Sequence, residues 1–255
     1  MKQKGKFEPF QAGGFSLPGS GGSKAPGVKV FLEADFNSAV HHYQNRRYEA
    51  ALEGFLKLVD PEKENLEVVY YLGLCCVKLK RFDEAILYLE QVVAHHSNIL
   101  LIYQSRMILS YIYCVTGRDR LAQFEIDRLL KQGFESPQVY ATLGYLHFRG
   151  DRVEESLSCL QKALKLDPEN PNVLNSLGYI LADKNLDPEK AVYYCQAAVK
   201  KNPQNYAYLD SLGWAYFKAG RYVEARDYLR KALDLARSNK TVAAHMRDLL
   251  DTQRK

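Results

Sequence analysis

The segment LGWAYFKAGRYVEARDYLRKAL, residues 212–233, decides the fold of this chain. Its opening Leu-Gly pair recurs upstream at Leu143–Gly144 and Leu177–Gly178, so that successive glycines lie 34 and 35 residues apart. A period near 34 residues, with small residues at fixed places inside two helical stretches, is typical of a stacked array of helix pairs. We therefore expect a line of similar units, an architecture that favours binding over catalysis.

Six helix pairs can be assigned on either side of this segment. They lie near residues 32–59, 66–94, 100–132, 137–166, 172–201 and 206–235. The third pair is degenerate, because Ser110 stands where the motif has its glycine. Residues 240–253 place apolar side chains on one stripe and charged ones elsewhere, which predicts a closing helix with a polar outer face.

Glycine at one fixed place supports this stacking. Two helices of about a dozen residues are marginal in water, so each pair needs a neighbour to cover its apolar surface. Glycine costs about 1 kcal/mol in a helix interior, and close approach of the facing helix gives a reason for it. The motif glycines are Gly73, Gly144, Gly178 and Gly213.

The chain before the array has a different composition. Residues 12–27 are rich in glycine, proline and serine and show no helical or strand period, so we expect them to lack regular structure. We predict a flexible basic tail over residues 1–30, the array over residues 31–237 and a capping helix over residues 238–255.

The charge distribution disfavours nucleic acid as a partner. The net charge is +5, but the first thirty residues alone hold five lysines and one glutamate. An array that binds nucleic acid would carry its excess positive charge along a folded face. We therefore expect no nucleic-acid partner.

The cysteines and the first residues predict a cytoplasmic protein. The five cysteines are odd in number, lie in apolar helical runs and lack zinc-site spacing. Buried free thiols indicate a reducing compartment. The chain shows no apolar core of signal-peptide length at its start and no run of about eighteen apolar residues that could span a membrane. The cysteines are Cys75, Cys76, Cys114, Cys159 and Cys195.

No motif indicates catalysis, a cofactor or a metal. Gly13–Gly14 and Gly19–Gly22 precede no strand–helix unit, so they fail the test for a nucleotide site. In the pairs His41–His42 and His95–His96, adjacent helical residues point about 100° apart, so neither pair can chelate one ion alone. We expect no enzymatic activity, no cofactor and no metal site.

These features together resemble those of tetratricopeptide-repeat proteins of the kind abundant in bacteria. The resemblance covers roughly residues 32–237, and AYLDSLGWAY, residues 207–216, is its most specific part. It implies an all-α, right-handed solenoid of antiparallel helix pairs, with a concave face that binds a protein or peptide.

Aromatic residues directly follow the motif glycine in three successive units. Tyr145, Tyr179 and Trp214 therefore point to the same side, and a ladder of rings suits a peptide with apolar anchors. The alternative is that these rings pack between neighbouring helices. The predicted partner-binding residues are Tyr111, Tyr145, Phe148, Asn175, Tyr179, Asp210, Trp214 and Phe217.

We hypothesise an adaptor or scaffold that holds a protein or peptide in an aromatic concave groove. The alternative is a structural subunit of a larger bacterial assembly that uses its ends, its convex face or its tail. Phe7, Phe10 and Phe15 suggest that the tail docks in the groove, on a partner or weakly on an anionic membrane, unless it is a disordered leader. The oligomeric state is left open.

Overall fold

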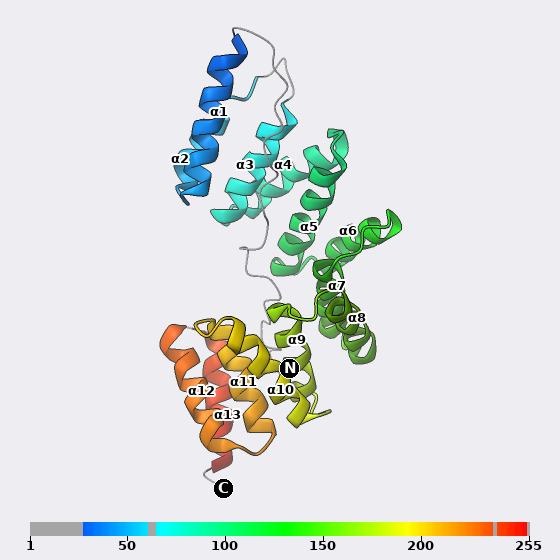
Figure 1. Ribbon diagram of the computed structural model, residues 1–255, viewed down its shortest axis with the longest axis vertical. Coiled ribbons are helices and arrows are strands. Elements are labelled where there is room, and N and C mark those ends of the chain that lie inside the picture. The colour runs from blue at the N-terminus through cyan, green and yellow to red at the C-terminus, as the bar shows by residue number, and fades with distance from the viewer. Residues whose placement is uncertain (1–27, 61–64, 237–238, 254–255) are drawn as a thin grey trace. The chain divides into compact units, whose positions relative to one another are not determined.

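The computed structural model describes residues 28–60, 65–236 and 239–253, and these residues form thirteen α-helices (Figure 1). The helices are α1 (Val28–Gln44), α2 (Tyr48–Leu56), α3 (Leu66–Lys78), α4 (Phe82–His95), α5 (Ile99–Val115), α6 (Asp119–Lys131), α7 (Pro137–Arg149), α8 (Val153–Leu166), α9 (Pro171–Asp183), α10 (Pro188–Lys201), α11 (Tyr206–Lys218), α12 (Tyr222–Leu235) and α13 (Lys240–Gln253). The all-α array of helix pairs predicted from the sequence is confirmed. The predicted tail lies almost wholly outside the described residues.

The helices belong to two compact units. The N-terminal unit holds α1 to α6, the C-terminal unit holds α7 to α13, and the division falls between Phe134 and Glu135. Within each unit, the two helices of a pair contact each other and the second helix contacts the first helix of the next pair. The division directly follows the third pair, whose motif is degenerate.

Each pair turns through one residue in the left-handed backbone region. These residues are Arg46, Lys80, Gly117, Asp151, Asn185 and Gly220, with φ between 53° and 77°. In the second pair, for example, the N–H of Lys80 bonds the carbonyl of Val77 and the N–H of Arg81 bonds that of Cys76. This arrangement satisfies carbonyls that the helix end would leave unpaired.

Close approach within the pairs accounts for the motif glycines. A Cβ added at Gly178 would lie 2.4 Å from Cys195 Sγ, and one added at Gly213 would lie 2.7 Å from Leu229 Cγ. Both contacts are shorter than any ordinary van der Waals separation. In the pairs that carry a motif glycine, the second helix therefore packs directly on the glycine backbone of the first.

Helix α13 has the register of a seventh first helix. The Asn239 side chain accepts hydrogen bonds from the N–H groups of Thr241 and Val242, as that of Asn205 caps α11 at Ala207, 34 residues earlier. The residue 34 positions after Gly213 is Arg247, which is exposed. An arginine there would hinder the close approach that the glycines allow in the preceding pairs.

Candidate functional site

The predicted binding residues lie on the first helices of the pairs. Tyr111 is on α5 in the N-terminal unit, whereas the other seven belong to the C-terminal unit. Those seven, here named the candidate site, are Tyr145 and Phe148 on α7, Asn175 and Tyr179 on α9, and Asp210, Trp214 and Phe217 on α11. The chain therefore does not bring all eight residues into one compact unit.

The rings that follow the motif glycines are buried. Tyr145 is 7% exposed, and Tyr179 and Trp214 are each 6% exposed. Phe148 lies edge-on to Tyr179 at a centroid distance of 6.1 Å, which joins α7 to α9. The expectation of rings standing exposed along one wall is therefore wrong for these three, because they pack among the helices.

Cations cover rings of the candidate site at the ends of the first helices. The pairs are Arg149 over Tyr145 at 5.7 Å, Lys184 over Phe148 at 5.5 Å and Lys218 over Trp214 at 4.7 Å. Positive charge is favoured near a helix C-terminus by the helix dipole, and the ring faces attract it as well. The partly exposed edge of the candidate site therefore carries cations beside the partly buried ring of Phe217.

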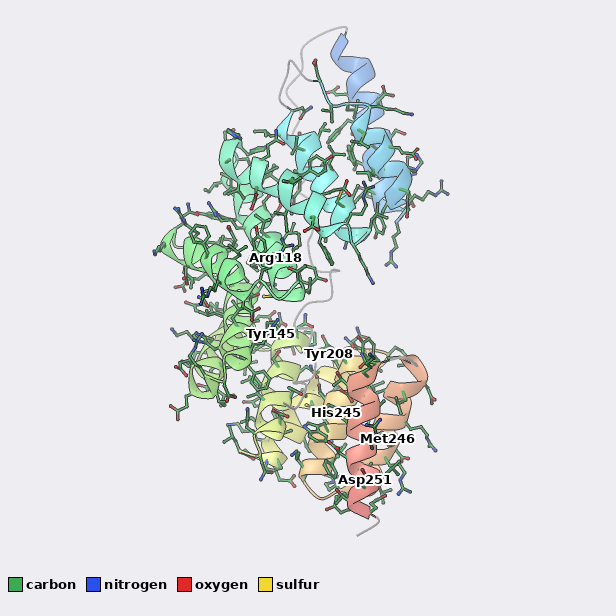
Figure 2. The ribbon with its side chains drawn as sticks, turned by 180° about the vertical axis from the view of Figure 1, so that it is seen from behind. Arg118, Tyr145, Tyr208, His245, Met246 and Asp251 are labelled. Carbon is green, nitrogen blue, oxygen red and sulfur yellow. The ribbon has the colours of Figure 1, made fainter. Side chains whose placement is uncertain are left out.

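A histidine from α13 completes the cluster. The His245 ring stacks on the Trp214 indole with centroids 4.2 Å apart and planes 19° apart. His245 Nδ1 lies 2.9 Å from Asp210 Oδ1, and the ring centroid lies 6.3 Å from that of Tyr179. Figure 2 shows His245 extending from α13 toward α9 and α11. The His245 ring and the Lys218 cation therefore both cover the Trp214 ring.

His245 was not among the predicted residues, although the sequence carries a signal for it. His245 stands 34 residues after Ser211, and earlier first helices of this unit carry a small hydroxyl residue at the same register position. These residues are Thr142, Ser176 and Ser211, and each hydroxyl donates to the carbonyl four residues before it. Aligned with the preceding first helices, α13 has an imidazole in place of a hydroxyl.

Two buried polar atoms of the candidate site have no hydrogen-bond partner within the described residues. They are Asn175 Oδ1 on α9 and Trp214 Nε1 on α11. Asn175 is only 4% exposed. A buried polar group without a partner costs about 1–3 kcal/mol, and such groups are uncommon in native proteins. One unused acceptor and one unused donor therefore remain in the site.

Burial favours the neutral forms of two ionisable side chains at the site, Tyr179 and Cys195. It raises the pKa of Tyr179 well above its usual range, and the carboxylates of Asp183 and Asp210 raise it further. Burial, with a smaller effect of Asp210, likewise raises the pKa of the Cys195 thiol behind Gly178. Burial therefore activates neither group as a nucleophile.

Two further features concern the described residues as a whole. No group of three or more His, Cys, Asp or Glu side chains among them is placed to hold a metal ion. None of the helices in this part of the chain combines the length and the apolar character needed to cross a membrane.

Comparisons with protein families match several parts of the chain. Models described as TPR repeat and tetratricopeptide repeat match residues 144–185 and 182–240. A model described as anaphase-promoting complex, cyclosome, subunit 3 matches residues 31–92. The matches to repeat models include α9, α11 and the residues of the candidate site that they carry.

Among curated proteins, human protein O-mannosyl-transferase TMTC1 is 27% identical over 188 residues, which are 72% of this chain and 21% of that protein. The chain thus spans about a fifth of the length of this relative.

Two solved structures are similar in fold. The Cut9–Hcn1 hetero-tetramer of the APC/C has a TM-score of 0.73 at 13% identity, covering 86% of this chain and 43% of that one. YrrB, a TPR protein with an unusual peptide-binding site, has a TM-score of 0.50 at 18% identity, covering 76% of this chain and 97% of its own.

Proposed function

We propose that this chain, which belongs to the tetratricopeptide-repeat family, is an adaptor or scaffold that binds a partner protein or peptide at the candidate site of its C-terminal unit. Proteins of this fold mediate protein–protein interactions. The observation that carries the proposal is the pair of buried polar atoms without partners, Asn175 Oδ1 and Trp214 Nε1.

The chemistry of these atoms fits a polypeptide. The amide oxygen of Asn175 accepts a hydrogen bond and the indole N–H of Trp214 donates one. A peptide main chain offers both an N–H and a carbonyl in every residue except proline. The partly buried Phe217 and the cation of Lys218 at the edge of the site add an apolar and a charged contact. The buried rings of Tyr145, Tyr179 and Trp214 then hold these contacting groups in place by packing among the helices.

The test is a selection of peptides from a random library on the immobilised full chain, followed by affinity measurements with variants. Trp214→Phe removes the N–H and keeps a ring, and Asn175→Ala removes the acceptor. Each lost hydrogen bond should weaken binding by about 1 kcal/mol, or roughly fivefold. Peptides that bind both variants as tightly as the wild type contradict the proposal. Circular dichroism checks that each variant folds.

A structural subunit of a larger assembly is the second candidate. Large apolar side chains are exposed on second helices: Leu87 is 68%, Tyr193 66% and Val223 74% exposed. The similar Cut9–Hcn1 structure is a hetero-tetramer. Under this alternative, Tyr193→Ser and Val223→Ser should abolish the capture of a large partner, whereas Trp214→Phe should not. These two substitutions also serve as matched surface controls for peptide binding.

The location and the absence of catalysis are also part of this proposal. We propose a cytoplasmic protein without enzymatic activity, cofactor or nucleic-acid partner. The five cysteines are buried thiols and form no disulfide with one another, which supports a reducing compartment. Measuring the native redox state of these thiols in cells would test the location.

A further inference from the structure

We infer that α13 covers the candidate site in cis, so that a partner reaches Asp210 and Trp214 by displacing His245. This inference rests on the proposed function, because it states what occupies the proposed binding surface before a partner arrives. α13 thereby acts as an internal competitor of the partner.

His245 covers residues of two earlier helices with one side chain. Its ring stacks on Trp214 of α11 and approaches the ring of Tyr179 on α9. Its Nδ1 pairs with the carboxylate of Asp210, and the side chains of both residues are 9% exposed. Such a set of stacking and polar contacts within one site is what a bound ligand would make.

Stacking of the helices does not require an imidazole at this position. At the same register position, α7, α9 and α11 carry Thr142, Ser176 and Ser211, whose hydroxyls bond to their own helices. Those helices stack in the array with a small side chain there. The imidazole of His245 therefore serves the contact with the candidate site instead of the helix packing.

Among the described residues, α13 packs against the array through one face. Its buried side chains are Val242, His245 and Leu249. Arg247 and Asp248 are exposed, and the helix contacts α11 and α12 as its neighbouring elements. A helix with few buried side chains opens more readily than helices that are buried on several faces. Displacement of α13 thus leaves the preceding pairs stacked.

The covered site leaves hydrogen-bonding capacity unused. His245 stacks on the Trp214 ring, yet Trp214 Nε1 has no acceptor among the described residues, and Asn175 Oδ1 has no donor there. A polypeptide main chain supplies both. A peptide segment that pairs these atoms therefore gains contacts that α13 does not make, which allows it to compete.

The first experiment uses the fluorescence of Trp214, the single tryptophan of the chain. His245→Ser restores the residue type of the earlier helices, and Asp251→Ser changes an exposed residue of the same helix as a matched control. In the full chain, His245→Ser should increase acrylamide quenching of Trp214, whereas Asp251→Ser should not. If quenching stays at the wild-type value in a folded His245→Ser chain, the inference that α13 covers the candidate site is wrong.

A second variant guards against loss of folding. Asp210→Asn keeps the shape of the side chain and removes the charge that faces His245. If circular dichroism shows that His245→Ser is unfolded, Asp210→Asn takes its place in the quenching experiment, with the same expected increase. Unchanged quenching in this folded variant would also contradict the inference that α13 covers the candidate site.

The third measurement distinguishes this inference from the proposed function. A library-selected peptide whose binding depends on Asn175 should bind the His245→Ser chain about tenfold more tightly, since a competing contact is removed. Equal or weaker binding overturns the competition and leaves the proposed function standing. If no peptide depends on Asn175, the proposed function fails, and the competition fails with it.

Discussion

Gly178 is the described glycine at which an added Cβ would make the shortest contact. A Cβ there would lie 2.4 Å from Cys195 Sγ and 2.9 Å from the backbone oxygen of Ala191. Because a backbone atom cannot move aside without shifting α10, Gly178→Ala should lower the free energy of unfolding by about 2–3 kcal/mol. Urea denaturation of the variant and the wild type measures the difference.

The control is Gly150→Ala in the same unit. The atoms nearest to a Cβ at Gly150 lie 3.5 Å away, and its φ is −79°. This substitution should change the free energy of unfolding by less than about 0.5 kcal/mol. Similar losses at both positions would contradict the role assigned to close approach.

Cys75 gives the molecule a predicted response to alkaline pH. Burial raises its pKa from 9.0 to about 12, and Cys76 contributes less. Because the folded pKa is above the unfolded one, the contribution is complete below pH 9.0 and is lost as the pH rises toward about 12. Within that window stability should fall by about 1.4 kcal/mol per pH unit for this group.

Urea denaturation of the wild type and Cys75→Ala between pH 8 and pH 10.5 tests this expectation. Other buried groups, such as Tyr208 with a pKa raised to about 12, add to the alkaline loss in both chains. The slope of stability against pH should therefore be shallower in the variant above about pH 9. Parallel curves would show that Cys75 makes no contribution.

Single residues were only partly predictable from the sequence. The phase of the repeat predicted that Tyr179 and Trp214 lie on equivalent faces of their helices, and both rings lie beside His245. Their burial also depends on side chains from other helices, Phe148 beside Tyr179 and His245 beside Trp214. The repeat pattern within a pair does not describe these contacts. The spacing of the repeat is a property of the local sequence. The burial of a side chain depends on which residues of other helices pack against it.

At the scale of the elements, the turn within each pair offers a stabilising substitution. Lys80 has φ of 60°, where Gly117 and Gly220 stand in equivalent turns. Lys80→Gly removes a backbone cost of about 1–2 kcal/mol and adds entropy to the unfolded chain worth about 0.4–1 kcal/mol. The net gain should be about 0.5–1 kcal/mol in urea denaturation.

Gly220→Ala is the reverse change at the equivalent place. It introduces a side chain at φ of 74° and should destabilise the chain by about 1 kcal/mol. If Lys80→Gly lost stability as well, the left-handed backbone would not be the property that the two turns share.

The helices themselves were the most predictable part of the structure. Their apolar period and the small residues inside the pairs are sequence-local signals, and each predicted pair corresponds to two observed helices. The lengthened turn before Pro188 also keeps the common geometry, because Asn185 takes the left-handed place that Gly220 takes in the next pair. The extra residue of this connection therefore lies between Asn185 and the start of α10, and the turn itself is unchanged.

At the scale of the molecule, the division into two units was not predicted. The 34-residue period continues past the division, so the pattern alone indicated one array. The hint in the sequence was the third pair, where Ser110 replaces the motif glycine. The stability of the contact between two helix pairs depends on all the residues in that contact. A single substitution such as Ser110 is therefore a weak signal of a division.

The division predicts that residues 135–255 fold without the rest of the chain. This unit contains three helix pairs that contact one another in sequence and a closing helix with exposed Arg247 at the glycine position. Three repeats are about the number that an array needs for stability, and a polar end helix protects one end from further stacking. The fragment should be helical by circular dichroism and should show the Trp214 emission maximum of the full chain. A fragment that is unfolded, or whose Trp214 emission shifts to that of solvent-exposed indole, would mean that the first three pairs are needed to build the candidate site.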